Sequence, residues 1–217
     1  MSADHAHHSH DPKGHDHNVH RHAHHSSRAQ LTLRAALASV SIALFLALLK
    51  TWASVETGSV AMLGSLADSA LDIVASLVTL YSVRLAAQPA DQEHRFGHGK
   101  AEALAALFQS GIITGSAIAI AWRGISRFGE TAPPAHPELG IGVSLVAMFA
   151  TLALIAYQKI VVAKTGSVAI HADHVHYSSD VLLNASVIAA LVLDSILGYR
   201  GADPLFGVAI ALWLIWH

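Results

Sequence analysis

Long apolar stretches separated by short polar breaks follow one another from about residue 30 to the end of the chain. An α-helix rises about 1.5 Å per residue and the hydrocarbon core of a bilayer is about 30 Å thick, so a helix needs about 20 residues to cross it. Six stretches reach or approach this length. The pattern predicts membrane spans at Leu31–Val55, Ser59–Ala86, Ala101–Phe128, Leu139–Ala163, Val175–Gly198 and Pro204–His217.

The fold class that follows is an all-α integral membrane protein, a bundle of six transmembrane helices. As a helix, residues 204–217 would reach only roughly 21 Å, which is less than the hydrocarbon thickness. We therefore expect the given sequence to be a fragment. Its natural form is expected to continue through the end of this helix and into a soluble region.

The first 28 residues differ in kind from the rest. Ten histidines lie among the first 25 residues, mixed with aspartate, proline and glycine. Such a segment has almost no apolar side chains to bury, so residues 1–28 are predicted to form a disordered, histidine-rich tail that binds metal loosely. An expression tag is the alternative, although a tag is normally an uninterrupted histidine run. The transmembrane domain then occupies residues 29–217.

Composition and charge narrow the class of protein further. The chain is 53% hydrophobic and 13% charged, whereas a soluble domain has roughly 25% charged residues. It has no cysteine, which excludes disulfide scaffolds and thiolate zinc sites. A formal net charge of −2 provides no polyanion-binding surface, so no nucleic-acid partner is expected.

The distribution of lysine and arginine predicts the orientation, because cytoplasmic loops carry the excess of these residues. One side of the predicted spans has Lys13, Arg21, Arg28, Arg34, Arg84, Arg95, Lys100, Lys159 and Lys164. The other side has Lys50, Arg123, Arg127 and Arg200. The tail and the polar segment 88–100 are therefore expected on the cytoplasmic side.

Charged side chains within the predicted spans indicate function, because a charge inside a bilayer is costly. The second span carries Asp68 and Asp72, and the fifth carries His176 and Asp180. Residues four apart share one face of a helix, so each pair can converge on one ion. Three carboxylates and one imidazole suit a tetrahedral transition metal such as zinc, whereas calcium and magnesium favour more oxygen ligands. A packing hydrogen bond explains one membrane aspartate, but it explains two matched pairs poorly.

A second polar group, Asp91, His94 and His98, lies between the second and third spans. Spacings of three and four residues allow these side chains to meet around one ion. The alternative is that they are ordinary interfacial polar residues, which need no metal.

A third polar group directly precedes the fifth span. Asp173 is predicted to be the N-cap of that helix, and His171 and His174 are predicted to line an entrance. Metal binding by these two histidines is the less favoured alternative.

These motifs resemble those of a known family. From about Leu33 to its end, the chain resembles the cation diffusion facilitators, and most closely their bacterial branch that exports ferrous iron and zinc. The motifs that carry the resemblance are SLADSALD at 65–72, QPAD at 88–91 with FGHGKAE at 96–102, and AD at 172–173 with HYSSDVLLN at 176–184.

The resemblance implies a divalent-cation efflux transporter that exchanges metal for protons in the bacterial inner membrane, and not an enzyme. Zinc, cadmium or ferrous iron would be its substrate, with no catalytic cofactor. By resemblance, the transport site is Asp68, Asp72, His176 and Asp180, and a second zinc site at the cytoplasmic face is Asp91, His94 and His98. Family members usually associate as homodimers through a cytoplasmic domain after the sixth helix, and we expect the given residues to lack that domain.

The alternative reading is an integral-membrane metalloenzyme of the His-box type, because His94 and His98 form a His-x-x-x-His pair. A desaturase needs several such pairs, and the His-Glu-x-x-His signature of zinc proteases is absent. A membrane-anchored metal sensor or storage protein is a third reading. An anchor, however, gains nothing from carboxylates inside the membrane.

Overall fold

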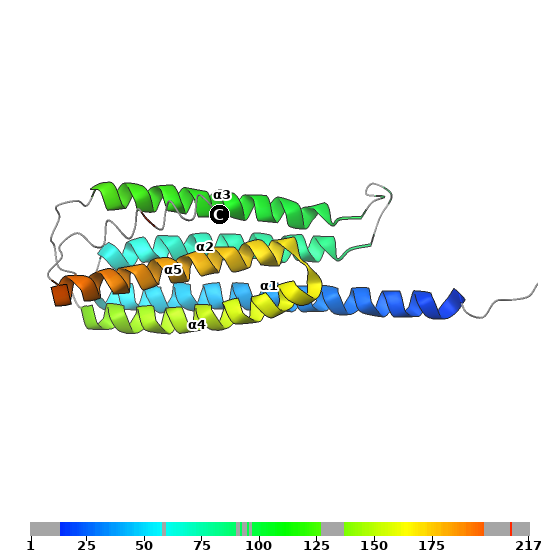
Figure 1. Ribbon diagram of the computed structural model, residues 1–217, viewed down its shortest axis with the longest axis horizontal. Helices are drawn as coiled ribbons and strands as arrows, with labels where there is room; N and C mark the ends of the chain where they lie inside the picture. Colours follow the sequence, from blue (N-terminus) through cyan, green and yellow to red (C-terminus); the bar gives the residue numbers. More distant parts are fainter. Residues whose placement is uncertain are drawn as a thin grey trace, which may run out of the picture.

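The computed structural model describes residues 14–57, 60–89, 92, 95, 97–126, 137–197 and 209. Within these ranges all regular secondary structure is helical. The helices are α1 (Gly14–Thr57), α2 (Val60–Ala86), α3 (Lys100–Ser126), α4 (Pro137–Thr165) and α5 (Val168–Leu197). The helices lie side by side with their axes roughly parallel, and α1 extends far beyond the others at its N-terminal end (Figure 1).

The predicted all-helical membrane architecture is confirmed in the described part of the chain. Four helices contain a segment that is long and apolar enough to cross a membrane, namely Ser27–Glu56, Asp68–Ala86, Lys100–Ala119 and Gly142–Thr165. The bounds of α2, α3 and α4 follow the predicted spans to within a few residues. The sixth predicted span, 204–217, lies outside the described residues except for Ala209.

The start of α1 differs from the sequence-based prediction. The helix begins at Gly14, whereas the composition predicts a disordered tail through residue 28. Extending an existing helix adds a hydrogen bond for each residue and requires no new nucleation. Neither glycine nor proline interrupts the chain between His15 and Thr57. The membrane-spanning part of α1 is therefore continued backwards as helix, and the remainder of the predicted tail, 1–13, lies outside the described residues.

The packing centres on α1, which contacts α2 and α4, while α5 packs on α4 and on α3. The inner face of α1 has small buried side chains at Ala35, Ala36, Ser39 and Ala43. Small side chains allow helix backbones to approach closely, which is how helices pack in membranes. Large apolar side chains, including those of Leu48, Trp52, Phe149 and Trp122, are exposed on the outside of the bundle.

A tight connection joins α4 to α5. Gly166 has a φ of 69°, the left-handed conformation that ends many helices, and its N–H donates to the carbonyl of Val162 at 2.8 Å. Ser167 then caps α5, since its Oγ accepts from the N–H of Ile170 at 3.3 Å. The carboxylate of Glu102, in the first turn of α3, accepts from Ser167 Oγ at 2.7 Å and from the N–H of Val168 at 3.0 Å. Glu102 therefore attaches α3 to the first turn of α5.

Replacing Glu102 with alanine is expected to weaken this attachment. A carboxylate at a helix N-terminus contributes about 0.3–1 kcal/mol, and up to about 2 kcal/mol when it is partly buried, as Glu102 is. The thermal unfolding midpoint in detergent should fall, and the amide protons of Val168 and Ala169 should exchange faster. Glu56→Ala, at an exposed position near the end of α1, is the control. Unchanged exchange at both amides would contradict the prediction.

Candidate metal centre

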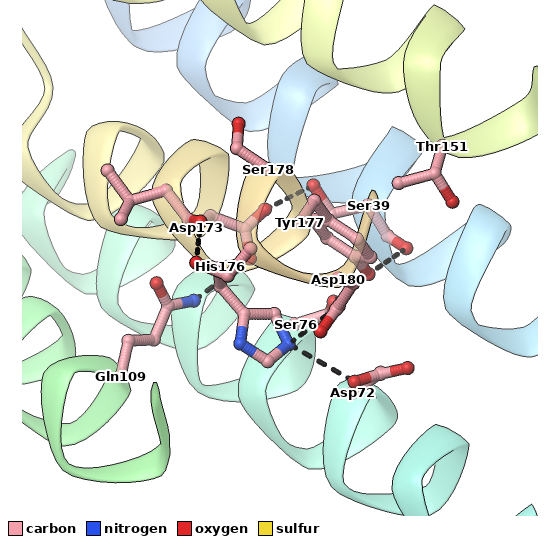
Figure 2. A network of polar contacts seen from close by, with 12 residues as sticks. Ser39, Asp72, Ser76, Gln109, Thr151, Asp173, His176, Tyr177, Ser178 and Asp180 are labelled. Atoms are coloured by element: carbon pink, nitrogen blue, oxygen red, sulfur yellow. Dashed lines mark hydrogen bonds and ion pairs between the residues drawn. The ribbon is translucent and has the colours of Figure 1, made fainter. Parts of the chain in front are cut away.

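Three side chains from α2 and α5 meet inside the bundle. His176 Nε2 lies 3.1 Å from Asp72 Oδ1 and 3.6 Å from Asp180 Oδ2. One ligand atom from each residue lies within 4.8 Å of the other two. Asp72 comes from α2, and His176 and Asp180 lie one turn apart on the same face of α5. In Figure 2 the imidazole points toward the carboxylate of Asp72.

The spacing suits a tetrahedral metal ion. Zinc binds an imidazole nitrogen at about 2.0–2.1 Å and a carboxylate oxygen at about 2.0–2.2 Å, so neighbouring ligands of a tetrahedral ion are about 3.3–3.5 Å apart. The two distances measured from His176 Nε2 lie on either side of this range. The three side chains can therefore bind one ion after small rotations, and a fourth coordination position remains for another ligand.

Burial and charge also suit a divalent cation. The exposed fraction of the side chain is 5% for His176, 14% for Asp72 and 35% for Asp180. The imidazole is the innermost of the three ligands, and Asp180 is the outermost. Two carboxylates balance the charge of a divalent cation, which lowers the free energy needed to hold that ion within a membrane bundle.

Asp68, the fourth predicted ligand, lies one turn from Asp72 on α2. Its side chain is exposed, and it is not part of the three-residue group. The structure thus brings together three of the four residues predicted for the intramembrane site. Whether Asp68 completes the coordination of a bound ion stays a prediction.

The second predicted site is only partly within the described residues. Asp91 and His94 lie outside them, and His98 is half-buried in the turn that leads into α3. The carbonyl of His98 accepts from the N–H of Ala101 at 2.9 Å. This turn lies at the end of the bundle where α5 begins, and His176 is nine residues, or roughly 13 Å, further along α5 than Ser167. His98 therefore lies apart from the three-residue group.

The predicted N-cap role of Asp173 is wrong. The helix α5 begins at Val168, seven residues before the predicted start, and Ser167 is its N-cap. Asp173 is instead fully buried within the helix, whereas His171 is exposed and His174 is half-buried. The predicted span began at Val175, where the long apolar run starts, so the prediction missed the first seven residues of the helix, about two turns.

The carboxylate of Asp173 is surrounded by polar side chains that the sequence-based reasoning missed. Ser39, Gln109 and Gln158 each donate a hydrogen bond to it, and all three are fully buried. The signal that was available is a glutamine within each of two apolar spans. A buried amide needs a partner, and another buried polar group is the natural one.

Comparisons with known proteins agree with this fold. Residues 36–216 match the cation efflux transmembrane domain family. The cation-efflux pump FieF of Yersinia pestis (strain Pestoides F) is 48% identical over 182 residues, which are 84% of this chain and 60% of that protein. FieF of Yersinia pseudotuberculosis serotype O:3 (strain YPIII) matches with the same identity and coverage.

The chain therefore belongs to the cation efflux family. It is a multi-pass membrane protein of a transporter family, and its regular structure is helical throughout the described ranges. This membership removes the support for the His-box metalloenzyme reading. The chain spans 60% of the length of the curated relatives that it matches.

Proposed function

We propose that this protein exports divalent metal cations across the membrane and that Asp72, His176 and Asp180 bind the cation during transport. The observation that carries the proposal is the convergence of these three ligand atoms from α2 and α5. Membership of a cation efflux family supports it independently. Asp68, one turn away on α2, is proposed as the fourth ligand.

Zinc is the proposed substrate. One nitrogen and three oxygens in tetrahedral arrangement suit zinc, and the same ligands also accept cadmium and ferrous iron. The distances around His176 Nε2 support a small transition-metal ion over calcium, whose oxygen ligands number six to eight. In this role the metal is the transported substrate, and no catalytic cofactor is required.

Exchange of metal for protons follows from the chemistry of these ligands. A bound metal requires ionised carboxylates and an imidazole whose Nε2 is free of a proton, so metal binding displaces protons. Conversely, protonation of the same atoms weakens metal binding. If the centre opens to the two sides of the membrane in turn, an inward proton gradient drives metal outward. Rocking of the helices around the centre is the proposed alternating-access movement.

The remaining features of the proposal concern orientation, the second site and assembly. The N-terminus and the segment 88–100 are proposed to lie in the cytoplasm of a bacterium, with the helices in the inner membrane. In support, the N-terminal extension of α1 and the turn that contains His98 lie at the same end of the bundle (Figure 1). Asp91, His94 and His98 are proposed to bind a second zinc ion there. A homodimer is proposed for the full-length protein.

Zinc flux into vesicles tests the proposed function. The chain is reconstituted into liposomes that contain a zinc-sensitive dye, and a pH gradient is imposed. We expect zinc uptake that depends on the gradient and that falls when a proton ionophore removes it. Asp72→Ala should abolish this uptake, because the variant retains only His176 and Asp180 of the three gathered ligands.

Glu56→Ala, which changes an exposed carboxylate at the end of α1, is the matched control and should transport normally. Equal zinc uptake by the Asp72→Ala variant and the unmodified chain would refute the assignment of the site. Uptake that ignores the pH gradient would refute proton coupling while leaving metal transport in place.

A further inference from the structure

The fully buried carboxylate of Asp173 connects four helices at a point one turn from His176. Its Oδ2 accepts from Ser39 Oγ on α1 at 2.5 Å and from Gln158 Nε2 on α4 at 2.7 Å. Its Oδ1 accepts from Gln109 Nε2 on α3 at 2.9 Å. Asp173 is itself on α5, so hydrogen bonds from three other helices meet on one side chain (Figure 2).

The one helix not yet mentioned, α2, is also joined to this face of α5. Gln109 Nε2 also donates to Thr79 Oγ1 on α2 at 2.6 Å. One turn after Asp173, the hydroxyl of Tyr177 lies 2.8 Å from Ser76 Oγ on α2 and donates to the backbone carbonyl of Ser39 at 3.3 Å. Ser76 is one turn from the metal ligand Asp72. The polar contacts therefore extend from Asp173 to a point on α2 that is one turn from the metal centre.

A buried carboxylate is a costly way to hold helices together unless its donors are matched. In a membrane bundle an apolar side chain of similar size is compatible with close packing and requires no partners. Three donors from three helices satisfy the Asp173 carboxylate only at one rotation and one height of α5. These hydrogen bonds therefore fix the rotation and height of α5, in addition to holding the helices together.

The position of α5 matters because His176 must reach Asp72 on another helix. The Nε2 atom of a helical histidine lies roughly 6 Å from the helix axis, so a rotation of α5 by about 10° moves it by about 1 Å. A functional centre tolerates only about 0.5 Å of misplacement of its ligands. The 3.1 Å distance between His176 Nε2 and Asp72 Oδ1 therefore depends on what fixes the rotation of α5.

We propose that Asp173 is a positioning residue for the metal centre: its hydrogen bonds to Ser39, Gln109 and Gln158 fix the rotation of α5 that presents His176 and Asp180 to Asp72. The proposal rests on the proposed function, in which those three residues bind the transported cation. Asp173 contacts no ion itself in this role. It acts through α5, on which His176 lies three residues later.

Two substitutions at Asp173 separate hydrogen bonding from charge. Asp173→Leu keeps the same branched skeleton of four side-chain heavy atoms and removes every acceptor. Asp173→Asn removes the charge but preserves the bonding, because its oxygen can accept from Ser39 and Gln158 while its amide donates to Gln109. For this, the Gln109 amide turns over to present Oε1, which has no hydrogen-bond partner among the described residues. The hydroxyl of Thr79 then donates to the same oxygen.

Cobalt(II) serves as the probe, because its visible absorption is intense in a tetrahedral site and weak in a six-coordinate one. The cobalt absorption of the metal centre is taken as the part of the unmodified chain's absorption that is lost in the Asp180→Ala variant. We expect Asp173→Leu to lower the cobalt affinity of this signal about tenfold or more and to reduce its intensity, as altered support of metal ligands does. Asp173→Asn should restore both to within about threefold of the unmodified chain.

Several results would overturn the proposal. One is an unchanged affinity and spectrum in a folded Asp173→Leu protein. Another is an Asp173→Asn protein as impaired as Asp173→Leu, which would assign the effect to charge. If the unmodified chain lacks an Asp180-dependent cobalt signal, the proposed function fails together with this inference. A loss confined to the Asp173 variants has no such consequence for the proposed function.

A milder pair of variants decides the question if Asp173→Leu does not fold. Ser39→Ala removes one donor to the Asp173 carboxylate, whereas Ser82→Ala removes a buried hydroxyl that donates only within its own helix, to Thr79 at 2.8 Å. The first should weaken cobalt binding and the second should not. Equal cobalt affinity and equal spectra in the two variants would overturn the proposal.

Discussion

Alanine in place of Asp180 is expected to lower the affinity of the protein for zinc by about a hundredfold or more. Changes in residues that merely support a metal ligand typically cost about 10- to 100-fold in affinity, so removal of a ligand should cost at least as much. Asp180 is one of only three described residues gathered in the centre. Its loss leaves His176 and Asp72, whose ligand atoms are 3.1 Å apart, without the second carboxylate that balances a divalent cation.

Competition with a chelator of known affinity measures this loss. The histidines of the first 25 residues are present in both proteins, so their own zinc binding cancels in the comparison. Glu56→Ala is the matched control, because it removes an exposed carboxylate at the end of α1 and leaves all of the proposed ligands in place. Its zinc affinity should equal that of the unmodified chain. Unaltered zinc affinity in Asp180→Ala would contradict the assignment of the metal centre and would shift the binding to the histidine-rich tail or to Asp91, His94 and His98.

Zinc affinity is also expected to fall steeply as the solution becomes more acidic. The zinc-bound centre requires both carboxylates ionised and His176 Nε2 unprotonated, so the metal-free centre binds more protons than the metal-bound one. Each proton displaced by zinc weakens binding by up to about tenfold for each pH unit that the solution is lowered. One or two displaced protons thus predict a loss of about 10- to 100-fold between pH 7 and pH 6.

Calorimetry in two buffers of different ionisation enthalpy counts these protons directly. The difference between the two observed binding enthalpies is proportional to the number of protons released at a given pH. Asp180→Ala should release fewer protons than the unmodified chain, because one carboxylate that can exchange a proton for zinc has been removed. Zinc binding with the same affinity at both pH values, and no proton release, would rule out proton competition at this centre.

The ligands of the metal centre were accessible to sequence-based reasoning because they break an otherwise apolar pattern. Asp72 and Asp180 are charges within long apolar segments, where few other reasons for a charge exist. Helical periodicity then places His176 on the same face as Asp180. What periodicity leaves open is which faces of α2 and α5 meet, and only the packed bundle shows that Asp72 is gathered with them while Asp68 is exposed.

The N-cap prediction for Asp173 was wrong because of the residues directly around it. An aspartate just before an apolar run resembles an N-cap, and hydropathy alone starts that run at Val175. The better signal was Gly166 followed by Ser167, a left-handed glycine and a capping serine that end α4 and begin α5 without an intervening loop. With that start, Asp173 falls near the middle of the second turn of α5, where its carboxylate can be reached from α1, α3 and α4.

The length of α1 limits what its N-terminal histidines can do. A flexible chain of 28 residues has an end-to-end distance of roughly 30 Å and samples many positions, so it could deliver a bound ion to a nearby opening. A helix is a rigid spacer instead: from Ser27, where the apolar segment of α1 begins, back to Gly14 it holds the chain along roughly 20 Å of axis. While α1 stays helical, the backbone of residues 14–26 does not fold back toward His176. If this segment binds metal, as its composition predicts, we expect it to raise the metal concentration at the membrane surface and not to carry an ion to the metal centre.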